Sequence, residues 1–237
     1  MRSVFLVSLF AGLCCLSGSL QSQVKALPLH SRSPVQQFPR IFGLASKGMQ
    51  DRVNVVLADR EQMDLESRRD CLHTHLSQLR ATYDETIRLT YLSSSLLSID
   101  VRSTRIGCDA YPNIDMSYPL TIDLTSGKTI DWTIFFKEGF LDAKDGRVSP
   151  FTSLYLLHAN LDKECAAILS DRGTRYDLWL NAQRGLMAKP SLPHVVQACA
   201  ELVSIPFTEV QSAIRDPKIS QELSTYQSTS AAHKPLP

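Results

Sequence analysis

Cys71, His73 and His75 are residue types that bind transition metals, and they lie close together in the sequence. The apolar residues around them recur at helical spacing. On a helix, residues two positions apart point about 200° away from each other around the axis, so His73 and His75 could chelate one ion only on a strand. We therefore predict no metal site. We expect Cys71 to form a disulfide and both imidazoles to lie on the surface.

Two loop sequences match ion-binding motifs only in part. Thr125–Lys128 ends like a phosphate-binding loop, but the upstream glycine is missing and the segment joins predicted strands instead of opening a helix. Asp142, Asp145 and Gly146 are typical of a calcium loop, but they do not have the ligand spacing of an EF-hand. We predict an ordinary turn and a solvated loop, with no bound cofactor.

Carboxylates and histidines are further candidates for chemistry. A pair of carboxylates could supply the acid and base of a glycosidase if a cleft brought the two together. A histidine could act as a general base, but no nucleophile elbow, zinc-protease helix or serine–lysine motif accompanies one here. The candidates are Asp123 with Asp131, Glu138 with Asp142, His158 and His194. We assign no catalytic residue from the sequence.

An aromatic cluster follows the third predicted strand. It consists of Trp132, Phe135, Phe136 and Phe140. Two interpretations remain open at this point. The rings either pack in the core or form an exposed platform for a glycan or a protein partner.

The first residues predict export. Met1–Ser3 carry a positive charge, Val4–Leu16 form an uninterrupted run of apolar or small residues, and Ser17–Ser19 supply small residues for cleavage before Leu20. This is the layout of a secretory signal peptide. The run is too short to cross a bilayer, which takes about 20 apolar residues. We therefore place a signal peptide at 1–19 and expect a periplasmic or secreted protein without a transmembrane span.

The cysteines also indicate the compartment. Cys14 and Cys15 would suit a lipoprotein, but Leu13 stands where that motif needs a small residue. Lipidation and a buried N-terminal strand or helix are the alternatives to cleavage. The cysteines that remain after cleavage are Cys71, Cys108, Cys165 and Cys199. An even number in an oxidising compartment predicts two disulfides, in any of three pairings, and the absence of a CxxC motif gives no support to zinc-ribbon or thioredoxin-like chemistry.

The charge balance argues against two classes of partner. The sequence has 25 basic and 24 acidic residues, and removal of the signal peptide with its single Arg2 would leave 24 of each. A protein that binds nucleic acid needs a basic surface to neutralise phosphates. A protein held on a membrane surface by charge needs clustered cations. We expect neither kind of partner.

Hydrophobic periodicity predicts helices followed by a β meander. Helical spacing covers much of 47–80, with a break near Asp59. A period of two then marks a β-hairpin formed by 87–91 and 97–101, and a third strand at 118–124. One face of this meander is apolar, so we expect it to be buried.

A second helix is well delimited. Ser149 supplies a capping hydroxyl, Pro150 occupies the first helical position, and Gly173 ends the helix. Its buried stripe is predicted to be Leu154, Leu157, Leu161, Cys165 and Ile168.

Short elements complete the chain. We predict a strand at 176–180 with a return at 186–188, and a β-like run at 194–205. A capping box of Thr208 and Gln211 starts a short helix that ends near 214.

The order of these elements predicts one α+β domain at 46–215, with an antiparallel or mixed sheet packed on helices and stapled by disulfides. Three prolines make residues 20–45 an extended tether. The polar residues 216–237 are expected to form a loose tail.

The stretch from Tyr91 to Phe136 resembles the exported bacterial domain of unknown function 3298. The family pattern is a pair of strands, a Gly/Ala-rich loop, and an aspartate–leucine–x–threonine–glycine–lysine motif before a hydrophobic strand. Here the loop reads Gly107-Cys108-Asp109-Ala110-Tyr111-Pro112-Asn113 and the motif reads Asp123-Leu124-Thr125-Ser126-Gly127-Lys128. The likeness extends over residues 48–215 through Cys165 and Leu192–Glu201.

This family includes the C-terminal part of RsiV, an anti-sigma factor that senses lysozyme. Asp109 and Tyr111 stand where the family usually has Gly and His, so no role of that His is carried over. A transmembrane helix and a cytoplasmic sigma-binding segment are not expected here, so we do not expect an anti-sigma factor of this kind. The resemblance implies an envelope domain that binds a macromolecule, and it implies no catalytic residue.

The sequence therefore predicts an exported envelope module that binds a lysozyme-like muramidase or peptidoglycan. The candidate surface is the loop at 105–117 with Asp109, Tyr111, Asn113 and Asp115, whose acids suit a basic partner. The alternatives are a periplasmic hydrolase of glycan or peptide, using His194 or a carboxylate pair, and a purely structural envelope protein.

For the disulfides we predict the pairs Cys71–Cys108 and Cys165–Cys199. Each pair joins a helical region to a β region within one half of the chain.

Overall fold

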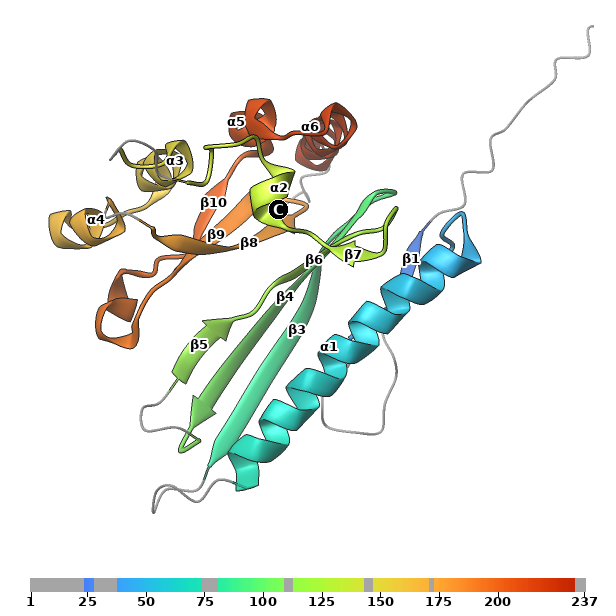
Figure 1. The fold of residues 1–237 in the computed structure, drawn as a ribbon, viewed down its shortest axis with the longest axis horizontal. Coiled ribbons are helices and arrows are strands. Elements are labelled where there is room, and N and C mark those ends of the chain that lie inside the picture. Colours follow the sequence, from blue (N-terminus) through green and yellow to red (C-terminus); the bar gives the residue numbers. More distant parts are fainter. Residues whose placement is uncertain are drawn as a thin grey trace, which may run out of the picture.

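The computed structural model describes residues 24–27, 38–73, 81–108, 113–142, 147–170 and 173–232, with side chains except at 113–115 and 226–232. The predicted signal peptide at 1–19 lies outside these residues, as does much of the predicted tether. The described part is an α+β fold of antiparallel sheets and helices, as the sequence predicted (Figure 1).

The larger sheet is covered by one long helix, α1 (Lys47–His73). Its strands are β3 (Thr82–Leu92), β4 (Leu96–Ile106), β5 (Asn113–Ser117), β6 (Leu120–Asp123) and β7 (Lys128–Thr129). They run in the order β3-β4-β6-β7, and β5 pairs with the second half of β4. The predicted hairpin is therefore confirmed, with strands longer than the sequence pattern indicated.

Val53 and Leu57 of α1 are fully buried in one cluster with Leu97, Ile99 and Val101 of β4. Alternate residues of a strand point to one face, so these three β4 side chains form a continuous apolar row. Burial of side chains of this size contributes about 1.5–3 kcal/mol each. This row holds α1 on the sheet.

The predicted break near Asp59 is wrong. α1 continues through Asp59 because Arg60 and Asp64 extend the stripe of residues that faces the sheet. Arg60 Nε lies 3.3 Å from Asp64 Oδ2, and Arg60 also donates a hydrogen bond to the carbonyl of Tyr118. The stripe thus changes from apolar to charged halfway along the helix without interrupting it.

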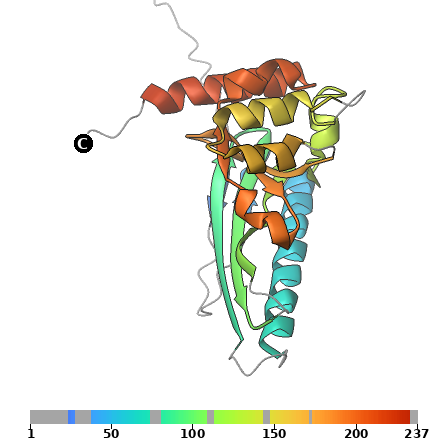
Figure 2. The ribbon, with the colours of Figure 1, turned by 90° about the vertical axis from the view of Figure 1, so that its left-hand side faces the viewer.

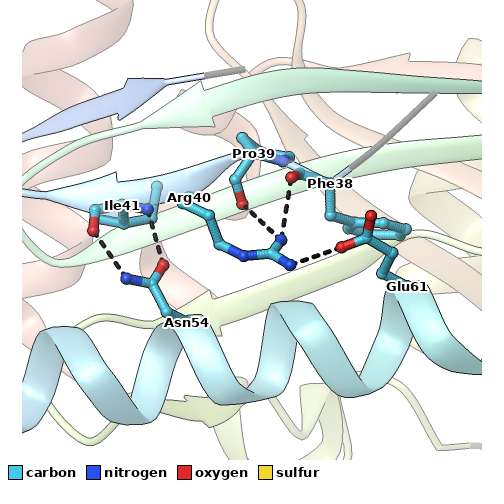
Figure 3. A network of polar contacts seen from close by, with 6 residues as sticks. All are labelled: Phe38, Pro39, Arg40, Ile41, Asn54 and Glu61. Atoms are coloured by element: carbon cyan, nitrogen blue, oxygen red, sulfur yellow. Dashed lines mark hydrogen bonds and ion pairs between the residues drawn. The ribbon is translucent and has the colours of Figure 1, made fainter. Parts of the chain in front are cut away.

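Part of the predicted tether belongs to the core instead. β2 (Arg40–Phe42) pairs with β1 (Lys25–Leu27) and lies against α1, and Phe38 and Ile41 are fully buried. Figure 3 shows the side-chain amide of Asn54 bonded to both the N–H (2.8 Å) and the C=O (3.0 Å) of Ile41. Arg40 reaches Glu61 Oε2 at 2.6 Å in the same view.

The smaller sheet carries the remaining helices. Its order is β10 (Val203–Ile205), β9 (Gly185–Ser191) and β8 (Arg175–Asn181). The helices are α2 (Trp132–Phe135), α3 (Pro150–His158), α4 (Lys163–Ser170), α5 (Phe207–Val210) and α6 (Pro217–Ala232), with 3₁₀ turns η1 (His194–Cys199) and η2 (Gln211–Ala213). Figures 1 and 2 show α3, α5 and α6 on the side that faces away from the larger sheet.

The two sheets meet through hydrogen bonds of small hydroxyl residues. Ser98 of β4 is fully buried, accepts a hydrogen bond from the N–H of Leu180 (3.0 Å) and bonds to Thr121 Oγ1 (2.8 Å). Thr90 of β3 donates to the carbonyl of Leu180 (2.7 Å), and its own carbonyl accepts from the N–H of Ala182 (2.9 Å). These bonds satisfy backbone groups of β8 where it crosses β3 and β4.

The single helix predicted from Pro150 to Gly173 is two helices, α3 and α4. Ser149 caps α3 as predicted, but Ala159 has an extended backbone with ψ of 143°. The N–H of Asn160 then donates to Glu201 Oε2 (2.8 Å), which stabilises the break from a distant segment. Leu157, which was predicted in the buried stripe, is 81% exposed as a result.

Three predictions for the C-terminal part are also corrected. The run at 194–205 is η1 followed by β10. The capping box of Thr208 and Gln211 does not form, because α5 begins directly after Pro206, whose ring fixes φ for helix entry. Much of the predicted loose tail is helix α6, which inserts the buried Leu223 into the core of the smaller sheet.

Both disulfides join the predicted pairs. Cys71–Cys108 links the end of α1 to the residues after β4 (Cα–Cα 4.6 Å), and Cys165–Cys199 links α4 to η1 (Cα–Cα 5.1 Å). Their cysteines are 37 and 34 residues apart in the sequence. Closing loops of this length restricts the unfolded chain and stabilises the fold by about 2–4 kcal/mol for each bond.

The contacts of Ser98 predict a cost for its removal. Ser98→Ala would leave the N–H of Leu180 without its acceptor in a buried site, and we expect the free energy of unfolding in urea to fall by about 1–3 kcal/mol. Ser153→Ala is the matched control, because Ser153 is exposed and bonds only within its own helix. Equal stability of the two variants would contradict this account of the junction.

Candidate functional site

The surface predicted around 105–117 is placed only in part. Asp109 and Tyr111 lie outside the described residues. Asn113 and Asp115 belong to β5, which replaces the second half of the predicted loop because it pairs with the part of β4 that β6 does not reach. Their side chains are not among those described, so the proposed contacts of these four residues remain predictions.

Asp123 and Asp131, a candidate acid–base pair, each serve a local turn. Burial raises the pKa of Asp123, but hydrogen bonds from Thr125 and Ser126 outweigh it and leave the pKa lowered. Hydrogen bonds from Thr133, at the start of α2, lower the pKa of Asp131. Both carboxylates are therefore ionised near neutral pH, and neither is arranged to donate a proton as a general acid would.

The candidate histidines make ordinary surface contacts. His158 Nε2 lies 2.8 Å from Glu209 Oε2, and His194 Nδ1 lies 3.2 Å from Gln197 Oε1. His73 is exposed at the end of α1, and His75 lies outside the described residues. Within the described segments, no three His, Cys, Asp or Glu side chains gather in a group that could hold a metal ion.

A cleft of about 530 Å³ opens between α2 and the start of β8. Among the residues that line it are Asp131, Trp132, Asp142, Arg175 and Tyr176. We call it the Trp132 cleft. Its walls come from segments more than 40 residues apart in the sequence, 130–133 and 174–178, so the two sheets together position it.

Trp132 is supported from behind by core aromatics. Its ring stacks on Phe136 with centroids 6.0 Å apart and meets the edge of Phe135 at 5.0 Å. Phe135 and Phe136 are buried, whereas Trp132 is half-buried and lines the cleft. The core interpretation is confirmed for Phe135 and Phe136, whereas the indole of Trp132 presents an apolar surface to the cleft. A glycan or protein partner for this surface remains a prediction.

Tyr176 is held equally firmly on the other wall. Its ring contacts Phe151 (4.9 Å) and Tyr155 (5.1 Å). Burial raises the pKa of Tyr176, so the hydroxyl stays protonated near neutral pH and bonds to Thr152 Oγ1 (3.1 Å). Thr152 Oγ1 in turn accepts from Ser149, the N-cap of α3. The sequence pattern predicted the cap but not that it orients a residue of the cleft.

The Trp132 cleft combines aromatic and charged side chains. Two aromatic side chains flank it, and two carboxylates and one guanidinium border it. The candidate histidines His158 and His194 are not part of its wall. A mainly apolar concavity with a few polar groups is the usual form of a ligand site.

A second cluster of ionisable groups lies between α1 and β3. Burial raises the pKa of Asp64, while Arg60 lowers it; burial and then the charge of Asp64 raise the pKa of Glu85. Tyr83 donates to Glu85 Oε2 (3.0 Å), and Arg105 lies over the Tyr83 ring at 5.0 Å. The space beside Asp64 and Glu85 has no room for a water molecule, so we interpret this cluster as structural.

The raised pKa of Glu85 predicts a pH dependence of stability. A carboxyl that holds its proton more tightly in the folded state stabilises the fold fully below its ordinary pKa of 4.5, and this contribution is lost as pH rises through the raised value. Glu85→Gln cannot ionise but keeps the acceptor for Tyr83.

Urea unfolding of both proteins at about pH 4 and about pH 7 measures this contribution. We expect the stability of the original protein relative to Glu85→Gln to fall between the two pH values. A constant difference would mean that the pKa of Glu85 is the same in both states.

Comparison with known proteins finds a similar fold among solved structures. No protein-family model matches the chain, and no curated protein matches it. Its fold is similar to the crystal structure of a member of the DUF3298 family from Bacteroides fragilis, with a TM-score of 0.50 and 12% sequence identity over 86% of this chain and 97% of that one. The chain therefore has the fold of a DUF3298 family member, as the sequence resemblance predicted.

Proposed function

We propose that this protein is an exported module of the cell envelope and that it binds the glycan strands of peptidoglycan in the Trp132 cleft. The observation that carries the proposal is the fixed pair of aromatic side chains, Trp132 and Tyr176, on the walls of one cleft. The C–H faces of a sugar ring are apolar and pack on aromatic rings, while its hydroxyls need polar partners at the edges.

The polar groups at the rim complete this arrangement. Asp142 is exposed and borders the cleft, and the Asp131 carboxylate, already held by Thr133, stays ionised. Carboxylates accept hydrogen bonds from sugar hydroxyls, which fixes the orientation of the ring. Because Trp132 and Tyr176 are held by core contacts, ligand binding would immobilise few additional side chains.

Export is supported by the covalent structure of the fold. Disulfides form and persist in oxidising compartments, and this chain has two. The signal-peptide interpretation of residues 1–19 places the protein in such a compartment. Among the described helices, none has the length and apolar character needed to cross a bilayer.

The experiment is cosedimentation of the purified, oxidised protein with insoluble peptidoglycan. We expect Trp132→Ala to weaken binding at least tenfold, about 1.4 kcal/mol, because the sugar loses its stacking surface. Ile134→Ala is the matched control: Ile134 is 60% exposed on the same short helix and does not line the cleft. Thermal unfolding of both variants separates lost binding from lost fold.

Two other outcomes would replace the proposal. Binding to a lysozyme-like muramidase without binding to peptidoglycan would make the partner a protein. Release of soluble fragments from peptidoglycan, abolished by His194→Ala, would make the protein a hydrolase. Unchanged sedimentation of Trp132→Ala would remove the cleft from the function.

A further inference from the structure

The Trp132 cleft shares part of its wall with a second cavity. This cavity has a volume of about 290 Å³ and lies beside the start of α3. Its wall includes Ser149 and Thr152, and it shares Asp142, Thr174 and Arg175 with the Trp132 cleft. Arg175 therefore lies beside both the aromatic cleft and the second cavity, within the reach of a ligand bound in the cleft.

Arg175 lines both cavities, and its guanidinium forms no ion pair with another described residue. It is exposed and begins the edge strand β8, where its backbone pairs with Ser191. Its guanidinium has no hydrogen-bond or ion-pair partner within the described part of the chain. By contrast, Lys137 and Arg215 border another cavity, and both donate to backbone carbonyls, those of Ser212 and Phe136. A guanidinium without a partner beside two cavities is available for a carboxylate ligand.

We infer that the ligand of the Trp132 cleft is an acidic glycan and that Arg175 binds a carboxylate on a substituent of the bound sugar. The sugar ring lies between Trp132 and Tyr176, and the substituent occupies the second cavity. This inference rests on the proposed function and names the chemical class of its ligand. In peptidoglycan, short peptides attached to the sugar carry such carboxylates.

The second cavity has the polarity that a peptide substituent requires. Thr152 contributes a hydroxyl that is already oriented by Ser149 and Tyr176, and Thr174 stands next to Arg175 in the shared wall. Asp142, on the same shared wall, can accept hydrogen bonds from peptide N–H groups. Opposite charges on Asp142 and Arg175 fit a substituent that offers both donors and a terminal acid.

The test compares two ligands that differ in one group. One is the N-acetylglucosamine–N-acetylmuramic acid disaccharide with a two-residue peptide stem that ends in a free carboxylate. The other has the same stem with its carboxyl amidated. In calorimetric titration we expect the acid to bind about tenfold more tightly than the amide. We expect this difference in affinity to become smaller at high salt, because salt screens the charge of Arg175.

The variants assign the preference to one side chain. Arg175→Gln is expected to bind the acid and the amide with equal affinity. Arg175→Lys is expected to restore part of the preference, since it keeps the charge but loses the bidentate geometry. The matched control is Arg184→Gln, which removes the same charge from the exposed turn at the other end of the β8–β9 hairpin.

The possible failures are distinguishable. Equal binding of acid and amide by the original protein overturns the role of Arg175 and leaves glycan binding intact. An Arg175→Gln variant that keeps the full preference for the acid also overturns it. Binding of neither disaccharide overturns both this inference and the proposed function.

Discussion

The geometry of the molecule depends on how β8 crosses the edge of the larger sheet. Ser98 and Thr90 are both small enough to let the backbone of β8 approach, and both use their hydroxyls to satisfy its N–H and C=O groups at Leu180. The Trp132 cleft has one wall that follows β7 and another at the start of β8. The two walls are therefore carried by different sheets, which these buried hydrogen bonds hold together.

Local patterns predicted the elements whose contacts are near in sequence. The hairpin of β3 and β4 has a period of two at 87–91 and 97–101, within strands of 11 residues each, and the start of α3 has both a capping serine and a proline. The disulfide pairs followed from the placement of cysteines in each half. For these elements, hydrophobic periodicity, capping residues and cysteine placement all predicted the same structure.

Two of the errors originate in distant contacts. The break after α3 depends on Glu201, 41 residues away, and the burial of Leu223 depends on a core that α5 and the smaller sheet complete. Trp132 was recognised as a candidate, but nothing near it in sequence indicates Tyr176 or Arg175. Trp132, Arg175 and Tyr176 line one cleft because the two sheets pack together, and the hydrophobic periodicity of single elements does not predict how sheets pack.

The side-chain amide of Asn54 bonds to the N–H and C=O of Ile41, as the backbone of a neighbouring strand would. Further along α1, Glu61 forms an ion pair with Arg40. All partners of this contact lie within residues 38–61, so the contact between β2 and α1 needs no residue of the larger sheet. Phe38 and Ile41 nevertheless remain uncovered until Leu97 and Ile99 arrive. The N-terminal segment therefore begins a hydrophobic cluster that is completed only by strands of the larger sheet.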